Sequence, residues 1–214
     1  MKFTKSIGLF SICLLAANVA RADTLVSNTT YGYDSEFWWD SIGQSFTTGS
    51  SSSGYSVSSI ALLFGVDHLY NGAKMYLYSS AYTDTVGNLG TGTDFIASAA
   101  TSDGTTWSFS NVTLNPNATY YFYVTCLQSD CAAANGSGYL YWDYYLDYNS
   151  YNYTGGQSYF ASGDNGTGAT FSVWNSACDF LFTVTGTVVP EPAAVAGFAG
   201  LAALGFAAMK RRRS

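Results

Sequence analysis

The apolar residues of this chain recur with a period of two over short runs, which is the pattern of half-buried β-strands. In the runs 119–126 and 178–184, every even-numbered residue is aromatic, aliphatic or cysteine. Between residues 23 and 187, no apolar stretch with the 3.6-residue period of a helix is longer than about two turns. The pattern therefore predicts strands that each turn one face to a core.

Gly, Asn, Ser and Asp separate these runs, and such residues are typical of turns. We predict strands over 24–27, 42–47, 55–64, 73–79, 94–100, 106–114, 119–126, 139–148, 157–161, 170–174 and 179–188. Ten or eleven short strands of this kind predict an all-β fold, an antiparallel two-sheet β-sandwich of jelly-roll-like order. A closed barrel is the alternative.

The N-terminus has the features of a secretory signal peptide over residues 1–22. Two lysines precede the apolar run 7–17, and Ala20 and Ala22 supply a small-x-small cleavage site that leaves Asp23 as the first mature residue. We therefore expect a signal helix, export through the Sec machinery and removal of the helix by signal peptidase.

A second apolar segment covers residues 193–209. Its 17 residues reach about 26 Å as a helix, at the short end of what spans a bilayer core. A basic end over 210–214 follows at once, with Lys210, Arg211, Arg212 and Arg213. Such clusters stay on the cytoplasmic side. The sequence predicts a C-terminal transmembrane helix, with the preceding domain on the far side of the inner membrane.

The motif Pro190-Glu191-Pro192 joins the domain to this helix. Its prolines favour an extended chain, which suits a protease substrate. The motif, apolar helix and basic end over 189–214 resemble the PEP-CTERM sorting signal. The resemblance implies processing by an exosortase-type transpeptidase in a Gram-negative bacterium that makes exopolysaccharide, and delivery to the cell surface or extracellular matrix. A plain tail anchor is the alternative. The predicted division is 1–22, 23–187 and 188–214.

The exported domain carries a fainter resemblance. Ile-Gly-Gln-Ser-Phe-Thr-Thr-Gly at 42–49, Tyr-Ser-Val-Ser-Ser-Ile-Ala-Leu at 55–62 and Asn-Pro-Asn-Ala-Thr-Tyr-Tyr-Phe-Tyr-Val at 115–124 are similar to the choice-of-anchor R domain family. The similarity spans most of 25–186. That family has no established activity, so it implies no catalytic residue.

The net charge of the exported domain restricts the classes of partner that it can bind. Between residues 23 and 189 the chain has one basic residue, Lys74, and thirteen acidic ones, a net charge near −12. Such a domain repels phosphate backbones, which excludes nucleic acid as a partner. It suits divalent cations, neutral glycans or basic surfaces. Asp84, Asp103 and the turn 163–166 are candidate ligands of a structural Ca²⁺, although Asp and Asn in turns usually serve the backbone. No other cofactor or metal is predicted.

Catalytic chemistry has little support in the sequence. The single histidine, His68, has no nucleophile elbow to accompany it. Asp143 and Asp147 on one strand would be about 13 Å apart, too far for a glycosidase pair. Asp34 and Glu36 are in range, but we expect them in a loop without further acid or base. We predict that the chain is not an enzyme.

One face of the predicted strand 139–148 is the most distinctive candidate site. Leu140, Trp142, Tyr144, Leu146 and Tyr148 form its apolar face, and Tyr139, Tyr141, Asp143 and Tyr145 lie on the other. Tyrosine rings stack on sugars and carboxylates bind their hydroxyls, whereas tyrosine on an exposed sheet is also ordinary. Trp38 and Trp39 form a second, equally ambiguous aromatic cluster.

Three cysteines follow the signal peptide, in a compartment that permits disulfides. Cys126 and Cys131 can close a short turn, or Cys126 can pair with Cys178 between the sheets. Taken together, the sequence predicts an exported surface or matrix protein with a structural or adhesive role linked to exopolysaccharide or biofilm. The alternatives are a carbohydrate-binding module and, after it, a polysaccharide-active enzyme.

Overall fold

The structure is a computed structural model. It describes residues 22–29, 33–37, 41–63, 73–101, 103–125, 142–146, 153–161, 167–173 and 179–191, with the backbone alone for 33–37, Asn111 and 142–146. Within these ranges no helix is long and apolar enough to cross a membrane. The predicted signal helix and transmembrane helix lie outside them.

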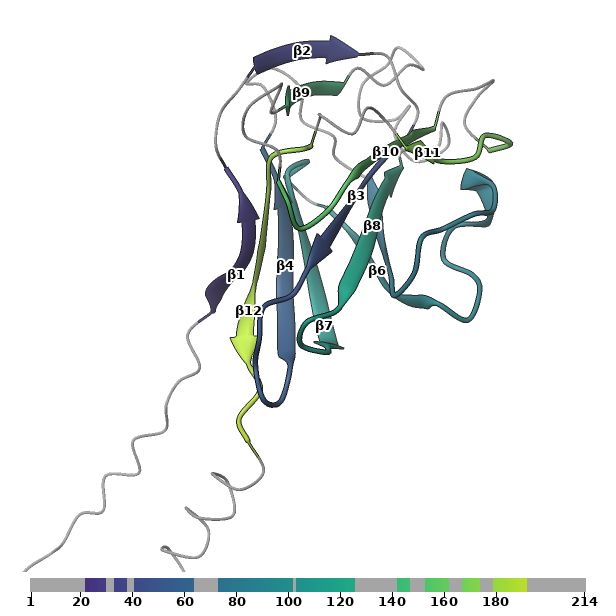
Figure 1. The fold of residues 1–214 in the computed structure, drawn as a ribbon. Coiled ribbons are helices and arrows are strands. Elements are labelled where there is room, and N and C mark those ends of the chain that lie inside the picture. Colours follow the sequence, from purple (N-terminus) through teal and green to yellow (C-terminus); the bar gives the residue numbers. More distant parts are fainter. Residues whose placement is uncertain are drawn as a thin grey trace, which may run out of the picture.

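Twelve strands and one 3₁₀ turn make up the described part of the chain (Figure 1). They are β1 (Asp23–Asn28), β2 (Tyr33–Phe37), β3 (Ser41–Thr47), β4 (Tyr55–Leu62), β5 (Lys74–Tyr78), η1 (Val86–Asn88), β6 (Phe95–Ala100), β7 (Thr106–Leu114), β8 (Thr119–Thr125), β9 (Trp142–Leu146), β10 (Ser158–Ala161), β11 (Ser172–Val173) and β12 (Phe182–Val188).

Two large antiparallel sheets pack face to face, which confirms the predicted two-sheet β-sandwich. The four-stranded sheet has the order β1-β12-β4-β7, and the six-stranded sheet has the order β11-β10-β3-β8-β5-β6. Their inner faces share one core, in which Phe46, Ile60, Trp107, Phe122 and Phe182 are fully buried. The Trp107 indole N–H donates to the Ala73 carbonyl at 2.9 Å, so this core ring has no unsatisfied donor.

The period-two pattern locates the core correctly in the strands that carry it. Tyr120, Phe122 and Val124 of β8 point inward, and Phe182 and Val184 of β12 meet them from the other sheet. Strand β7 has the predicted bounds, and most others differ from prediction by one to three residues at an end. Alternation of this kind needs only local sequence to be recognised.

One prediction about local structure is wrong. The segment with Asp34 and Glu36 was expected to be a loop, but it forms β2 and pairs with β9 in a separate two-stranded sheet. This sheet lies at one end of the sandwich (Figure 1). The two strands are more than 100 residues apart in sequence. A pairing of this separation depends on tertiary context and overrides the turn-rich composition of 30–36.

Candidate functional site

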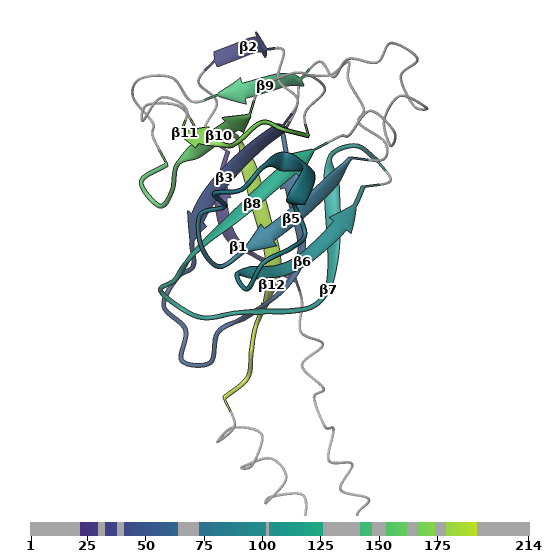
Figure 2. The ribbon, with the colours of Figure 1, turned by 90° about the vertical axis from the view of Figure 1, so that its right-hand side faces the viewer.

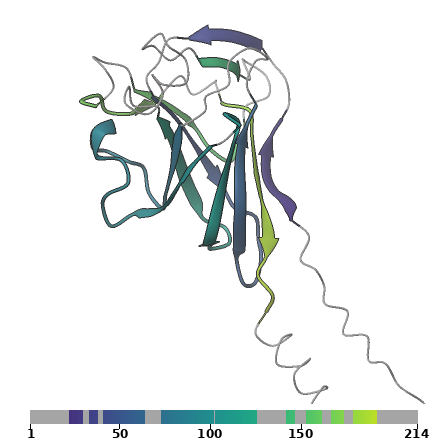
Figure 3. The same cartoon turned by 180° about the vertical axis from the view of Figure 1, so that it is seen from behind.

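The first and last strands of the sandwich are neighbours. Asp23 at the start of β1 pairs with Gly186 near the end of β12, and Val188 at the end of β12 pairs with Tyr55. Both ends of the domain therefore leave the sandwich on the same side (Figures 1 and 3). We call this end the base. It consists of Asp23, residues 188–191 and the turns 48–54 and 115–118.

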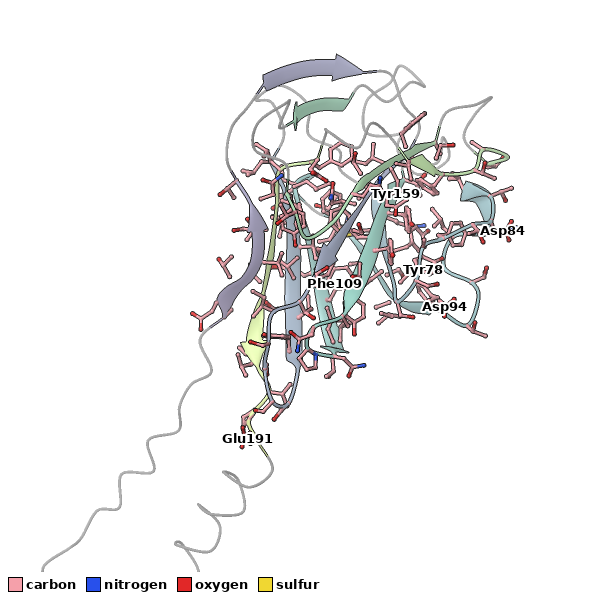
Figure 4. All side chains as sticks on the ribbon, viewed as in Figure 1. Tyr78, Asp84, Asp94, Phe109, Tyr159 and Glu191 are labelled. Atoms are coloured by element: carbon pink, nitrogen blue, oxygen red, sulfur yellow. The ribbon has the colours of Figure 1, made fainter. Side chains whose placement is uncertain are left out.

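The predicted sorting motif begins at the base without a linker. The Val189 N–H donates to the Gly54 carbonyl at 3.0 Å, so the chain is held by the domain up to the residue before Pro190. Pro190 and Glu191 are exposed, and Glu191 projects below the sandwich (Figure 4). Pro192 and the basic residues 210–213 lie outside the described residues. Of the predicted signal cleavage site, Ala22 and Asp23 are exposed and described, and Ala20 is not.

The β2–β9 sheet lies at the opposite end and brings acidic residues into register. Glu36 pairs with Asp143, and Asp34 pairs with Tyr145. Directly paired residues lie on the same side of a sheet, and so do residues two apart on one strand. These four residues therefore share one face of the β2–β9 sheet. The sequence predicted the Asp143 and Tyr145 half of this face, but not the half from β2.

Several other predicted site residues lie outside the described residues, so their predictions stay untested. They are Tyr139 and Tyr141 of the candidate glycan face, the cysteines Cys126, Cys131 and Cys178, the lone His68, and the pair Trp38 and Trp39.

The outer face of the six-stranded sheet carries an aromatic cluster that was not predicted. Tyr123 of β8 lies between Gly43 of β3 and Tyr76 of β5, and Tyr159 of β10 pairs with Gly43. The Tyr123 ring contacts Phe171, with the two ring centroids 4.4 Å apart. Figure 2 looks onto this face, with the β5–β6 loop and its η1 turn lying in front of the strands.

Two tyrosine hydroxyls hold this loop in place. The Tyr123 hydroxyl accepts from the Tyr82 N–H at 3.0 Å, and the Tyr78 hydroxyl accepts from the Gly90 N–H at 2.7 Å. Burial raises the pKa of Tyr123 above its usual value and that of Tyr82 to about 12. The cluster is therefore a second core that attaches the β5–β6 loop to the sheet.

A signal for this second core was present in the sequence. Residues 120–123 read Tyr-Tyr-Phe-Tyr, so both faces of this strand are aromatic. A strand that is apolar on both faces is covered on both sides. The even positions of this strand predict the core between the sheets. The odd positions do not reveal their partner, because the covering loop, residues 79–94, is polar and turn-like in sequence.

Two of the acidic turn residues predicted as calcium ligands, Asp84 and Asp103, bind their own backbone, and the third candidate, the turn 163–166, lies outside the described residues. Asp84 accepts from the Thr85 N–H at 2.7 Å and from the Asn88 amide at 3.0 Å. Asp103 accepts from the N–H groups of Thr105 and Thr106, and these bonds hold the pKa of its carboxyl well below the usual range. Among the side chains that the structure describes, no three His, Cys, Asp or Glu residues gather in a group that could hold a metal ion.

One carboxylate is buried in the sandwich itself. Asp179, before β12, is 3% exposed and accepts from the Gln44 amide at 2.7 Å. The side-chain oxygen of the same amide, Gln44 Oε1, accepts from the Phe180 N–H at 3.0 Å. Gln44 therefore satisfies two polar groups of the segment that leads into β12, and this pairing fixes that segment to the six-stranded sheet.

Comparisons with known proteins find similarity in structure only. A crystal structure of the cysteine protease and lectin-like domains of Cwp84, a surface layer associated protein of Clostridium difficile, matches 73% of this chain and 36% of its own, with a TM-score of 0.40 and 11% identity. A structure of clostridial cysteine protease Cwp84 after propeptide cleavage matches 72% and 38%, with a TM-score of 0.38 and 13% identity. The chain thus spans little more than a third of these proteins. No family model and no curated protein matches it.

Proposed function

We propose that this chain is an exported surface or matrix protein, sorted by its PEP-CTERM-like tail and processed there by an exosortase-type transpeptidase. The observation that supports it is the arrangement of the base. The chain enters the domain at Asp23 and leaves it at Val189 on the same side. Both predicted membrane segments can then be in one bilayer while the folded domain projects away from it.

The strand order also supports the predicted jelly-roll arrangement. The orders β1-β12-β4-β7 and β3-β8-β5-β6 are those of two interleaved four-stranded sheets, with β10 and β11 added at one edge. Such a sandwich is a rigid spacer that holds the β2–β9 sheet away from the anchored base. A structural or adhesive role at the envelope or in exopolysaccharide fits this division.

Intact-mass spectrometry of the protein from its native host tests the sorting proposal. We expect the mature chain to begin at Asp23 and to end near the Pro-Glu-Pro motif. Glu191→Ala should accumulate as the uncleaved form, whereas Asp94→Asn, which changes an exposed carboxylate far from the base, should be processed normally. A mature wild-type chain that still contains Arg213 would refute processing.

A second candidate function, glycan binding, is favoured by the register of β2 and β9. This register places four residues on one face of the β2–β9 sheet: Asp34, Glu36, Asp143 and Tyr145. Carboxylates that bind hydroxyls beside an aromatic ring form a typical sugar-binding surface. Binding to a glycan array or to the native matrix polysaccharide should be lost in Tyr141→Ala plus Tyr145→Ala, and retained in Asp84→Asn. Failure of the wild-type protein to bind any polysaccharide would end this proposal. Release of new reducing ends in the same assay would indicate a polysaccharide-active enzyme instead.

A further inference from the structure

The base of the domain is a rigid surface built from two interlocked turns. The Thr48 hydroxyl donates to the Asn115 carbonyl at 2.7 Å, and the Asn117 N–H donates to the Gly49 carbonyl at 3.0 Å. Asn117 has a positive φ of 50°, a conformation that asparagine tolerates better than most residues. These contacts join the β3–β4 turn to the β7–β8 turn.

The exit of the chain is held by the same turns. Gly54 has a φ of 86°, and a Cβ at this position would overlap the Leu114 carbonyl oxygen, so only glycine fits. Its carbonyl accepts from the Ser51 hydroxyl at 3.1 Å as well as from the Val189 N–H. The point at which the chain leaves the domain is therefore part of the base itself.

The distance from this point to the predicted membrane helix is short. Three residues lie between Val189 and Ala193, and the four steps from one to the other span at most about 14 Å even when fully extended. The headgroup layer on one side of a bilayer takes up about 5–8 Å of that length. The base then has about one side-chain length of clearance from the lipid.

The charge of the base suits such an approach. No charged residue occurs in 41–63 or 104–125, the segments that contain both turns, although the exported domain is near −12 overall. The carboxylates at the base are those of Asp23 and Glu191. An acidic surface would be repelled by anionic headgroups, whereas serine hydroxyls and asparagine amides can hydrogen-bond to them.

We propose that the base, through the turns 48–54 and 115–118, rests on the lipid headgroups for as long as the tail is in the membrane. The proposal rests on the proposed function, because it requires residues 193–209 to be a membrane helix. It assigns to the base the lipid surface as its partner, and it orients the β2–β9 sheet away from the bilayer.

Hydrogen exchange of the full chain in lipid nanodiscs tests this contact without any processing enzyme. The chain is made in a host that lacks the transpeptidase, and it is compared with a variant that carries a Gly/Ser spacer of about 12 residues between Val189 and Pro190, which extends the tether by about 20 Å. Peptides that cover 48–54 and 115–118 should exchange several-fold more slowly in the wild-type chain than in the spacer variant. The loop 86–94 should exchange equally in both. Equal exchange at the turns would overturn the proposal.

A charge variant gives an independent readout. Ser50 and Ser52 are exposed, and their hydroxyls make no hydrogen bond within the described residues. Ser50→Glu plus Ser52→Glu should lose the protection of the turns in nanodiscs rich in anionic lipid and keep it in neutral lipid. The matched pair Ser108→Glu and Ser110→Glu, exposed on β7, should behave as wild type. The same exchange in both lipids for the Ser50 and Ser52 variant would contradict the charge argument. Retention of Arg213 in the mature chain from the native host would refute processing, but it would leave the lipid contact of the base standing.

Discussion

The Tyr123 ring lies directly over the Cα atom of Gly43 on the neighbouring strand, and a Cβ added to Gly43 would overlap the ring. Tyr123 is fully buried at this position, between the sheet and the β5–β6 loop. The contact connects a β3 glycine to the loop that covers the outer face of the sheet.

Gly43→Ala should therefore destabilise the domain. The added methyl group has no space unless the Tyr123 ring moves, and overpacking of this kind costs about 1–3 kcal/mol of unfolding free energy. Urea unfolding of the signal-cleaved chain measures it. Gly168→Ala is the matched control, because a Cβ there meets nothing within 4 Å, and its effect should stay within about 0.5 kcal/mol. Equal free energies of unfolding for the two variants would show that the contact between Gly43 and Tyr123 tolerates an added methyl group.

The outer face of the six-stranded sheet, which the β5–β6 loop covers, illustrates what local sequence can and cannot reveal. Alternation in β8 and β12 reveals the core between the sheets, because the order of apolar and polar residues within each strand identifies its buried face. The outer cluster needs Gly43, Tyr123 and Phe171, which come from three distant segments. The acidic face of β2 and β9 is a similar case. Spacing along one segment gives the separation of carboxylates within it, but Glu36 and Asp143 become neighbours only through a long-range register.

The buried pair of Gln44 and Asp179 gives a second prediction. Gln44→Leu keeps the approximate volume of the side chain but removes the donor to Asp179 and the acceptor for the Phe180 N–H. Leaving buried polar groups without these partners should cost about 1–3 kcal/mol. Urea unfolding measures this loss. Gln157→Leu is the control, because the Gln157 side-chain amide makes no hydrogen bond within the described residues. An effect of Gln44→Leu no larger than that of the control would show that the pair contributes little.

Alkaline pH should weaken the domain through its buried tyrosines. Burial raises the pKa values of Tyr78 and Tyr123 above the ordinary tyrosine value of about 10. The unfolded chain therefore loses its phenol protons first as the pH rises, and the folded state then holds more protons than the unfolded one. This contribution to stability is complete below pH 10 and is lost progressively above it. Thermal unfolding between neutral pH and about pH 12 should show the decline.

Tyr123→Phe separates this titration from general alkaline damage. The variant loses the hydroxyl that accepts from the Tyr82 N–H, so it should be less stable than wild type at neutral pH. Its melting temperature should also fall less steeply above pH 10, because one titrating group is gone. An unchanged slope would show that Tyr123 does not titrate on unfolding.

The last prediction concerns Glu36 and Asp143, which occupy directly opposite positions on β2 and β9. Like charges at such positions destabilise a strand pair, typically by about 0.2–1 kcal/mol. Glu36→Gln and Asp143→Asn should each slow hydrogen exchange of the β2 and β9 peptides, and the double variant should add little to either single one. Salt should reduce the difference, because screening weakens the repulsion in the wild-type protein. Asp34→Asn, opposite Tyr145, serves as the control and should change exchange less. Additive, salt-independent effects would mean that the two carboxylates do not interact. Coupling would mean that this face keeps two carboxylates together at a cost in stability, as the proposed glycan-binding surface requires.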